Sequence, residues 1–350
     1  MTNAEITKEN GKPRVGVVLF NLGGPETLDD VKPFLYKLFA DPETIRLPIP
    51  ALQKPLAWFI ATTRSAKSKT YYAAIGGGSP LRRITTAQAK ALEQELSDIS
   101  AKVYVAMRFW HPLTEETVSQ IVRDGITHLV ALPLYPQFSV ATSGSSFKAL
   151  IRAFEETGAP RKVRRHYISH WYQNPDYIAA FADKLSAEIA TFPDQKMENI
   201  HILFSAHSIP ISYVEKGDPY DRQTKETIEL IMKKIGRPFP RHLSYQSRVG
   251  PAKWLEPNTD QTVRRLGNEG VKQLVIVPIS FVSEHVETLY ELDILYKKVA
   301  DEVGIKELRR VPTLDTSPQF ISGLGTLVRD KLNKWAPETI SSTAVQQAKG

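Results

Sequence analysis

The chain has 350 residues, of which 42% are hydrophobic and 24% charged, proportions typical of a soluble globular protein. At roughly 100–200 residues per domain, this length predicts two domains. Because the sequence contains no cysteine, disulfides, thiolate catalysis and cysteine-ligated zinc or iron-sulfur sites are excluded. The net charge of +7 comes from basic residues that are scattered apart from short clusters such as Arg161, Lys162, Arg164 and Arg165. This distribution disfavours nucleic-acid binding and is compatible with an anionic substrate or an anionic membrane surface.

The first 14 residues carry two glutamates and no apolar run. This composition argues against a secretory signal or an Arg-rich transit peptide. We therefore expect a cytoplasmic protein.

Eight apolar runs, each followed by turn residues, predict β-strands separated by helical patterns. The predicted strands are 15–20, 103–107, 129–134 and 163–168 in the first half, and 200–204, 242–245, 274–279 and 308–314 in the second. Strands that alternate with helices indicate right-handed βαβ units and parallel sheets.

The two halves also repeat each other in sequence. Eight residues recur 145 positions later without a gap: Pro112, Thr114, Thr117, Val118, Gly125, Leu129, Val130 and Pro133 correspond to Pro257, Thr259, Thr262, Val263, Gly270, Leu274, Val275 and Pro278. We interpret this as a duplication and predict an α/β fold of two Rossmann-like, doubly wound parallel-sheet domains that face each other across a cleft. The expected domains are 1–165 and 166–317, with a C-terminal helix at about 318–340 packed back on the first domain and a flexible tail at 341–350.

An insertion distinguishes the first half. Its first two strands start 88 residues apart, at 15 and 103, against 42 in the second half, at 200 and 242. The additional segment, about 34–80, contains seven large apolar residues followed by three basic ones: Leu47, Ile49, Leu52, Leu56, Trp58, Phe59 and Ile60, then Arg64, Lys67 and Lys69. One interpretation is a helical hairpin packed on its own domain; the other is an apolar lip that lines a large ligand and enters a membrane interface.

Parallel sheets bind ligands beyond the carboxyl ends of their strands. The residues expected there are Asn21, Arg108, Tyr135 and His170 in the first half, and His207, Gln246, Arg248, Glu284 and Glu287 in the second. In a helix after the strand 274–279, Glu284, Glu287 and Glu291 would share one face. Like charges in a partly desolvated cleft raise each other's pKa, so such a row can take up and pass on protons.

A histidine facing carboxylates suits a borderline divalent metal such as Fe²⁺ or Zn²⁺, and also suits general-base catalysis. The HExxH pattern of metalloproteases is missing. Two glycine-serine segments, 75–80 (IGGGSP) and 142–146 (TSGSS), could bind an anion through backbone N–H groups, but neither is a Walker loop. Residues 21–25 (NLGGP) likewise lack the GxGxxG pattern of nucleotide-cofactor enzymes.

Six blocks of the sequence, in the same order, resemble those of the ferrochelatase family. They are LGGPET at 22–27, IGGGSP at 75–80, AMRFWHP at 106–112, FSAHS at 204–208, YQSRVGP at 245–251 and SEHVETL at 283–289. The resemblance extends from about residue 14 to about 330. It implies a lyase of heme biosynthesis that inserts Fe²⁺ into protoporphyrin IX, forms protoheme and releases two protons, with iron as a substrate and no required prosthetic group.

The resemblance also implies roles for individual residues. His207 and Glu287 would be the metal and proton-transfer pair, and Glu291 and Glu284 would extend an acidic track. The residues expected around the porphyrin are Leu22, Arg64, Tyr72, Ser79, Arg108, Phe109, Tyr135 and Trp254. The lip would make peripheral membrane contact.

The chain departs from the animal members of the family because it has no cysteine for an iron-sulfur cluster, and its polar C-terminus differs from the hydrophobic tail of some photosynthetic members. Three alternatives remain open on the sequence. They are a coproporphyrin ferrochelatase, a cobalt or nickel chelatase of another tetrapyrrole, and a tetrapyrrole-binding protein without turnover.

Overall fold

The computed structural model describes residues 13–42, 44, 49–158, 163–248, 250 and 252–340. Our expectations for Leu47, for Arg161 and Lys162 and for the tail at 341–350 lie outside these residues.

The first half of the chain forms a four-stranded parallel sheet in the order β2-β1-β3-β4. Its strands are β1 (Val15–Asn21), β2 (Lys102–Met107), β3 (His128–Pro133) and β4 (Arg164–Tyr167). Every residue of β1 and β3 is buried, as expected for central strands that helices cover on both faces.

The second half repeats this arrangement in the order β6-β5-β7-β8. Its strands are β5 (Ile200–His207), β6 (Arg241–Gln246), β7 (Gln273–Pro278) and β8 (Glu307–Arg310). β3 and β7 occupy equivalent positions 145 residues apart, as do α5 (Thr114–Arg123) and α10 (Thr259–Asn268). The predicted duplicated, doubly wound α/β fold is confirmed.

The last predicted strand was too long. We predicted 308–314, but β8 ends at Arg310. Val311 still donates its N–H to the carbonyl of Ile276, 2.9 Å away. Pro312 has no N–H to continue the ladder, and the chain then turns through Asp315, which has a φ of 44°.

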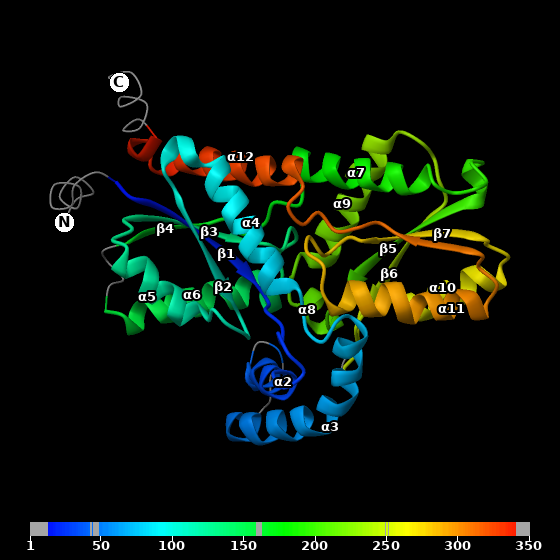
Figure 1. The fold of residues 1–350 in the computed structure, drawn as a ribbon, viewed down its shortest axis with the longest axis horizontal. Helices are drawn as coiled ribbons and strands as arrows, with labels where there is room; N and C mark the ends of the chain where they lie inside the picture. The colour runs from blue at the N-terminus through cyan, green and yellow to red at the C-terminus, as the bar shows by residue number, and fades with distance from the viewer. Residues whose placement is uncertain are drawn as a thin grey trace.

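Helices cover both faces of the two sheets (Figure 1). One layer contains α4 (Leu81–Glu95), α7 (Pro175–Ile189), α9 (Tyr220–Ile235) and α12 (Pro318–Trp335). The opposite layer contains α5, α6 (Ser145–Glu156), α10 and α11 (Tyr296–Glu302). The remaining helical segments are short: η2 (Ser97–Ile99), η3 (Val140–Gly144), η4 (Met197–Asn199), α8 (Ile211–Glu215) and η5 (Glu287–Leu295).

The two lobes share one hydrophobic core on the α4–α7–α12 side. Leu19 of the first sheet and Phe204 and Val277 of the second belong to the same buried cluster. On the opposite side each sheet has a separate core. The shared core therefore fixes the lobes relative to each other.

α12 bridges the two halves. Arg329 donates hydrogen bonds to the carboxylates of Asp98 and Glu95 in the first half, while Gly323 packs against Asn174 and Asp176 at the start of α7. The boundary that we expected at residue 165 falls within β4. We propose that the lobes divide at 168–174, between β4 and α7, with α12 returning to the first lobe.

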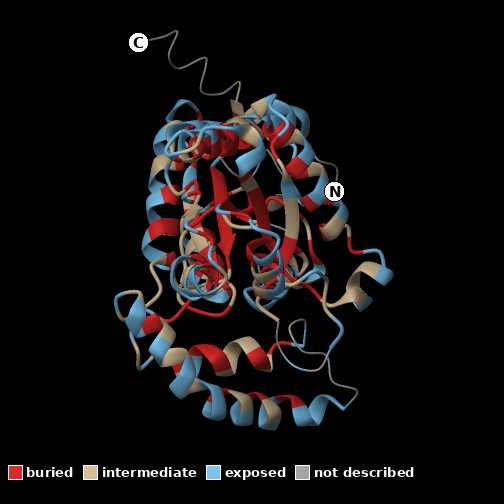
Figure 2. Cartoon of the chain, turned by 90° about the vertical axis from the view of Figure 1, so that its right-hand side faces the viewer, coloured by how far each residue is buried: buried red, intermediate tan, exposed pale blue. Residues whose placement is uncertain are grey.

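The insertion forms a projection made of α2 (Val31–Ala40), η1 (Pro50–Leu52) and α3 (Gln53–Ala74). We call this projection the lip. Its inner side packs in a cluster that includes Phe34, Phe39 and Phe109. Its outer helix carries Trp58 and Phe59, which are 58% and 59% exposed. Figure 2 shows the helices of the lip apart from the two sheets, with exposed residues along their outer side. Within the described residues, no helix has both the length and the apolarity needed to cross a membrane.

A histidine pair near the amino ends of β5 and β6 predicts that the stability of the fold depends on pH. Nδ1 of His201 lies 3.1 Å from Nε2 of His242. Burial lowers the pKa of both rings, and the neighbouring His201 and Arg265 help to bring the pKa of His242 from 6.5 to about 4. Because the pKa of His242 is lower in the folded chain than in the unfolded one, the unfolded chain takes up the proton first. The stability of the fold therefore decreases as the pH falls from 6.5 towards 4.

We therefore expect the melting temperature to fall less between pH 7 and pH 4.5 in His242→Gln than in the parent, by roughly 2–4 °C. Glutamine keeps a hydrogen-bonding side chain but cannot become charged in this range. Differential scanning calorimetry at the two pH values measures the effect, and parallel pH dependences in the two proteins would contradict it.

Candidate active site

His207 is the last residue of β5, at the carboxyl edge of the second sheet. Its Nδ1–H donates to the carbonyl of Ser208, 2.6 Å away, so Nε2 is the nitrogen left to face the site. The backbone beside it is held by Ser280, whose hydroxyl accepts the His207 N–H at 3.3 Å, and by Tyr220, whose hydroxyl donates to the His207 carbonyl at 2.9 Å. One hydrogen bond therefore orients the imidazole, and two more hold the backbone that carries it.

Two of the three acidic residues after β7 lie on a π-helix. We expected Glu284, Glu287 and Glu291 on one face of an ordinary helix, but η5 begins at Glu287 and has π geometry. Glu287 and Glu291 are four residues apart on η5, and the charges of both raise the pKa of His207. π-helical turns are rare and often occur at functional sites.

Glu287 lies between two histidines. Its Oε1 is 3.5 Å from Nε2 of His207, and its Oε2 is 3.6 Å from Nε2 of His285. The His207 side chain is 37% exposed and that of Glu287 19%, so the pair is partly desolvated and still reachable from solvent.

The electrostatics couple these groups. Burial would lower the pKa of His207, but the Glu287 carboxylate and the hydrogen bonds override it and raise that pKa to about 9. Burial would raise the pKa of Glu287, yet His207 and His285 hold it well below its usual range. At neutral pH, a protonated His207 therefore faces an ionised Glu287.

Glu291 has the opposite shift. Burial and the nearby Glu287 carboxylate raise its pKa to about 7. Its Oε2 accepts hydrogen bonds from Ser247 Oγ at 2.8 Å and from Gln246 Nε2 at 3.2 Å. Glu291 can therefore take up or release a proton near neutral pH.

Glu284 is held apart from this group. Its carboxylate accepts hydrogen bonds from Arg310 at 2.8 Å, from the backbone N–H of Thr313 at 3.0 Å and from the hydroxyl of Thr288. Although burial opposes the shift, Arg310 and these donors lower its pKa. The expectation of one continuous carboxylate face was wrong for this residue, because η5 starts three residues later and Arg310 of β8 draws the side chain away.

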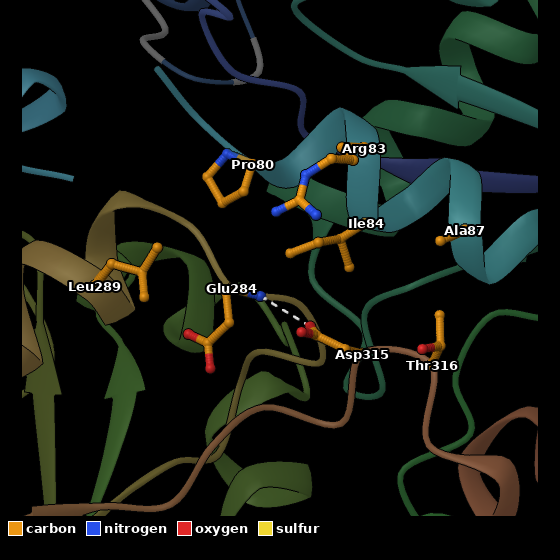
Figure 3. Close-up of a pocket in the computed structure, with 8 residues that line it drawn as sticks. All are labelled: Pro80, Arg83, Ile84, Ala87, Glu284, Leu289, Asp315 and Thr316. Atoms are coloured by element: carbon orange, nitrogen blue, oxygen red, sulfur yellow. Dashed lines mark hydrogen bonds between the residues drawn. The ribbon is translucent and has the colours of Figure 1, made fainter. Parts of the chain in front are cut away.

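Glu284 lines a cavity of about 350 Å³ between the two lobes (Figure 3). The first lobe contributes Pro80, Arg83, Ile84 and Ala87, and the second contributes Glu284, Leu289, Asp315 and Thr316.

Two loops of the first lobe meet near the lip. A Cβ at Gly24 would lie 2.7 Å from Ser79 Cβ, and one at Gly78 would clash with the carbonyl of Glu26. The glycines therefore permit close packing between the predicted segments 22–27 and 75–80. Ser79 donates its backbone N–H to the carbonyl of Pro25 at 2.7 Å.

Tyr72, at the end of α3, is buried. Burial raises the pKa of its hydroxyl, and the Glu287 carboxylate raises it further. Leu22 is half-buried against the cluster that contains Tyr72 and Phe109. The structure thus brings the lip side of the first lobe and the acidic helix of the second to the same region.

Arg108 is engaged in an internal ion pair. Its guanidinium donates to Asp41 Oδ2 and to Ser145 Oγ, at 2.8 Å each, and lies 5.0 Å from the centre of the Phe109 ring. Phe109 itself is buried. Both residues therefore have structural contacts inside the first lobe.

The other expected binding residues are dispersed. Arg64 is exposed on α3, with its guanidinium 5.9 Å from the centre of the Phe39 ring. Tyr135 has a buried hydroxyl, and burial raises its pKa. Trp254 is half-buried beside Pro210, to which it is bridged. His170, which we expected at a strand end, is exposed and stacks near Tyr172, 5.4 Å between ring centres.

Sequence reasoning missed His285, Tyr220 and Ser280. His285 stands two residues before Glu287 in a block that we had singled out, so its position was a usable signal. Tyr220 and Ser280 carry no local signal, because their role depends on contacts with a strand that ends far from them in sequence. In the described part of the chain, no group of three or more His, Asp or Glu residues is arranged to hold a metal ion.

Solved structures of chelatases share this fold. The SirB protein of Bacillus subtilis, determined with Fe³⁺, superposes with a TM-score of 0.53 over 92% of this chain and 97% of its own, at 13% sequence identity. A sirohydrochlorin chelatase SirB of Bacillus subtilis subspecies spizizenii, in complex with cobalt, gives a TM-score of 0.51 at 11% identity, covering 91% of this chain and 94% of its own. The chain therefore has the two-lobed chelatase fold.

The sequence comparisons are more specific. The family model for ferrochelatases matches residues 14–332. A ferrochelatase of Gloeothece citriformis is 53% identical over 92% of this chain and 83% of its own length, and one of Synechococcus sp. strain JA-3-3Ab is 54% identical over 92% and 95%. The chain belongs to the ferrochelatase family.

Proposed function

We propose that this chain inserts Fe²⁺ into protoporphyrin IX, forms protoheme and releases two protons. The observation that carries the proposal is the contact between Nε2 of His207 and the Glu287 carboxylate, 3.5 Å apart at the carboxyl edge of the second sheet. Family membership supports the same reaction. Iron is a substrate here, and with no cysteine in the chain a thiolate-bound iron-sulfur cluster cannot form. We propose that no prosthetic group is required.

Insertion requires two pyrrole N–H bonds to break, with each electron pair retained by nitrogen for the metal. His207 Nε2 accepts the pyrrole protons one at a time, and the Glu287 carboxylate provides a ligand for the incoming Fe²⁺. A proton already on His207 must leave first. The dication neutralises the Glu287 charge that holds this proton, which lowers the pKa of His207 and frees the base.

Glu291 carries protons away from the pair. Its pKa of about 7 lets it accept a proton and return it to solvent at neutral pH. We leave Glu284 out of this route because Arg310 neutralises it; we propose that Glu284 instead anchors the chain that leads into η5.

The first lobe binds the porphyrin. Leu22, Tyr72 and Tyr135 of this lobe surround the ring, supported by Arg108 and Phe109, and Trp254 of the second lobe completes the surroundings. Arg64, Ser79 and nearby backbone donors hold the propionates through charge-assisted hydrogen bonds. The lip and these aromatic side chains keep the ring out of plane, so that its nitrogen lone pairs point at the metal.

The test is an anaerobic spectrophotometric assay that offers protoporphyrin IX and coproporphyrin III, each with Fe²⁺, Co²⁺ and Zn²⁺. We expect protoheme formation from protoporphyrin IX. Metal insertion into coproporphyrin III alone would identify that porphyrin as the substrate. Porphyrin binding without insertion of any of the metals would indicate a tetrapyrrole-binding protein without turnover.

The lip predicts membrane association of a cytoplasmic protein. Trp58 and Phe59 expose apolar rings beside basic residues of the same helix, a combination typical of interfacial binding. We expect the double substitution of Trp58 and Phe59 by Ser to weaken sedimentation with anionic liposomes several-fold and to raise the porphyrin KM. Replacing the exposed Ile151 of α6 by Ser is the matched control, and equal sedimentation of all three proteins would contradict the prediction.

A further inference from the structure

A chain of buried hydrogen bonds runs beneath the site, through β5, β6 and α10. Ser205, Ser244, Gln246 and Thr259 are each 0% exposed. Ser205 Oγ donates to Gln246 Oε1 at 2.7 Å, Thr259 Oγ1 lies 3.0 Å from Ser205 Oγ, and Ser244 Oγ lies 2.9 Å from Thr259 Oγ1.

The hydrogen bonds of this series all point in one direction, from donor to acceptor. Each hydroxyl has a single proton, and the proton of Ser205 is committed to the Gln246 carbonyl oxygen. Thr259 therefore donates to Ser205, and Ser244 donates to Thr259. The Gln246 amide sets this direction: the Glu287 carbonyl can only accept, so the NH₂ group faces η5, where it donates to that carbonyl at 3.1 Å and to Glu291 Oε2 at 3.2 Å, and Oε1 faces Ser205.

The first lobe, built on the same plan, shows that the fold does not require this series of hydrogen bonds. Pro133 pairs with Phe20, and Pro278, 145 residues later, pairs with Ser205, so Phe20 and Ser205 are equivalent. Their partners on the next strand, Ala106 and Ser244, are equivalent in turn. At the same places in the same architecture, the first lobe has Phe and Ala where the second has two serines.

Buried hydroxyls are unfavourable unless they are hydrogen-bonded. The second lobe has polar groups at two core positions where the first has apolar ones, and the hydrogen bonds of these groups lead to Glu291. Ser247 adds a second donor to the same oxygen, at 2.8 Å, from a backbone with a φ of 64° that is uncommon outside glycine. Two donors from the end of β6 therefore converge on one carboxylate oxygen.

We propose that Gln246, oriented by Ser205, Thr259 and Ser244, is a positioning residue that holds the Glu291 carboxylate and the first turn of η5 in place for proton removal. The role of Glu291 rests on the proposed function, but the grip of Gln246 on η5 does not. Gln246 touches no substrate in this account and acts through Glu291.

Gln246→Met tests the proposal, because methionine has nearly the same length and no hydrogen-bonding amide. We expect kcat to fall roughly tenfold or more, as is common when a residue supporting a site is removed, with little change in the porphyrin Kd measured by fluorescence quenching. In the Glu291→Gln background the same substitution should lower kcat by a smaller factor than in the parent, since one of its two targets is already altered. Gln273→Met, which removes a buried amide at the opposite end of the sheet, should keep the parent kcat.

Hydrogen-deuterium exchange gives a readout that does not need activity. Gln246→Met should speed amide exchange in 287–295, and Gln273→Met should not. If Gln246→Met speeds exchange in 287–295 but the parent forms no heme, the positioning role of Gln246 stands and the proposed function is rejected. An unchanged kcat in Gln246→Met, multiplicative losses in the double variant, or unchanged exchange in η5 would each overturn the proposal.

Discussion

Replacing Glu287 by Gln is expected to lower kcat for Fe²⁺ insertion by roughly 100-fold or more, the usual effect of losing a positioned acid-base group. Glutamine keeps the shape of the side chain but removes its negative charge and its capacity for a proton. Both matter here, because the carboxylate lies between His207 and His285, at 3.5 and 3.6 Å. Without that charge, the site attracts the dication less, and the group beside His207 can no longer take up a proton.

Initial-rate measurements under anaerobic conditions, with porphyrin affinity measured separately, check this prediction. Glu291→Gln should cost less than Glu287→Gln, since water can bypass a group farther from the ring. Glu229→Gln, which breaks a surface ion pair with Arg241, is the matched control and should be neutral. If Glu287→Gln and Glu291→Gln both kept kcat within a few-fold of the parent, the acidic face of η5 would be an ordinary solvated surface.

Changing His207 to Ala should abolish insertion while porphyrin binding stays nearly intact, because apolar contact area holds the ring. The imidazole is the group whose Nε2 faces the Glu287 carboxylate, and its other nitrogen is occupied by the Ser208 carbonyl. Fluorescence titration of porphyrin and a heme-formation assay on the same preparation separate the two effects. Loss of both together would assign His207 a structural role.

The pH dependence of the parent adds to this test. Glu287 and the hydrogen bonds raise the pKa of His207 to about 9 although burial opposes the shift. Since kcat/KM reports ionisations of the free enzyme, it should rise with pH as His207 loses its proton, up to about 9. A kcat/KM that did not change between neutral pH and pH 9 would contradict this assignment.

The fold was predictable because its central strands are apolar on both faces and its halves repeat with a fixed spacing. Residues such as Val17 and Val130 are buried wherever helices cover both sides of a parallel sheet, so their pattern identifies the strands without tertiary information. The position of His207 in the site could be predicted for the same reason, because this residue lies at the end of such a strand.

The π-helix was not predictable. Residues 287–295 have the composition of any amphipathic helix, and no local pattern separates the π form from the α form. Arg108 illustrates a second limit. It stands at a strand end, but its guanidinium is bound by Asp41, a residue of the connector within the lip region that carried no signal. Tertiary partners decided both outcomes.

The most direct test of the account mixes the purified chain anaerobically with one equivalent each of protoporphyrin IX and Fe²⁺ in a weakly buffered solution. Loss of porphyrin fluorescence, appearance of the heme spectrum and proton release to an indicator dye are followed together. We expect protoheme with two protons released per heme in the parent, and bound porphyrin without heme or proton release in His207→Ala. Heme formation by His207→Ala at the parent rate, or porphyrin binding by the parent without heme formation, would contradict the account.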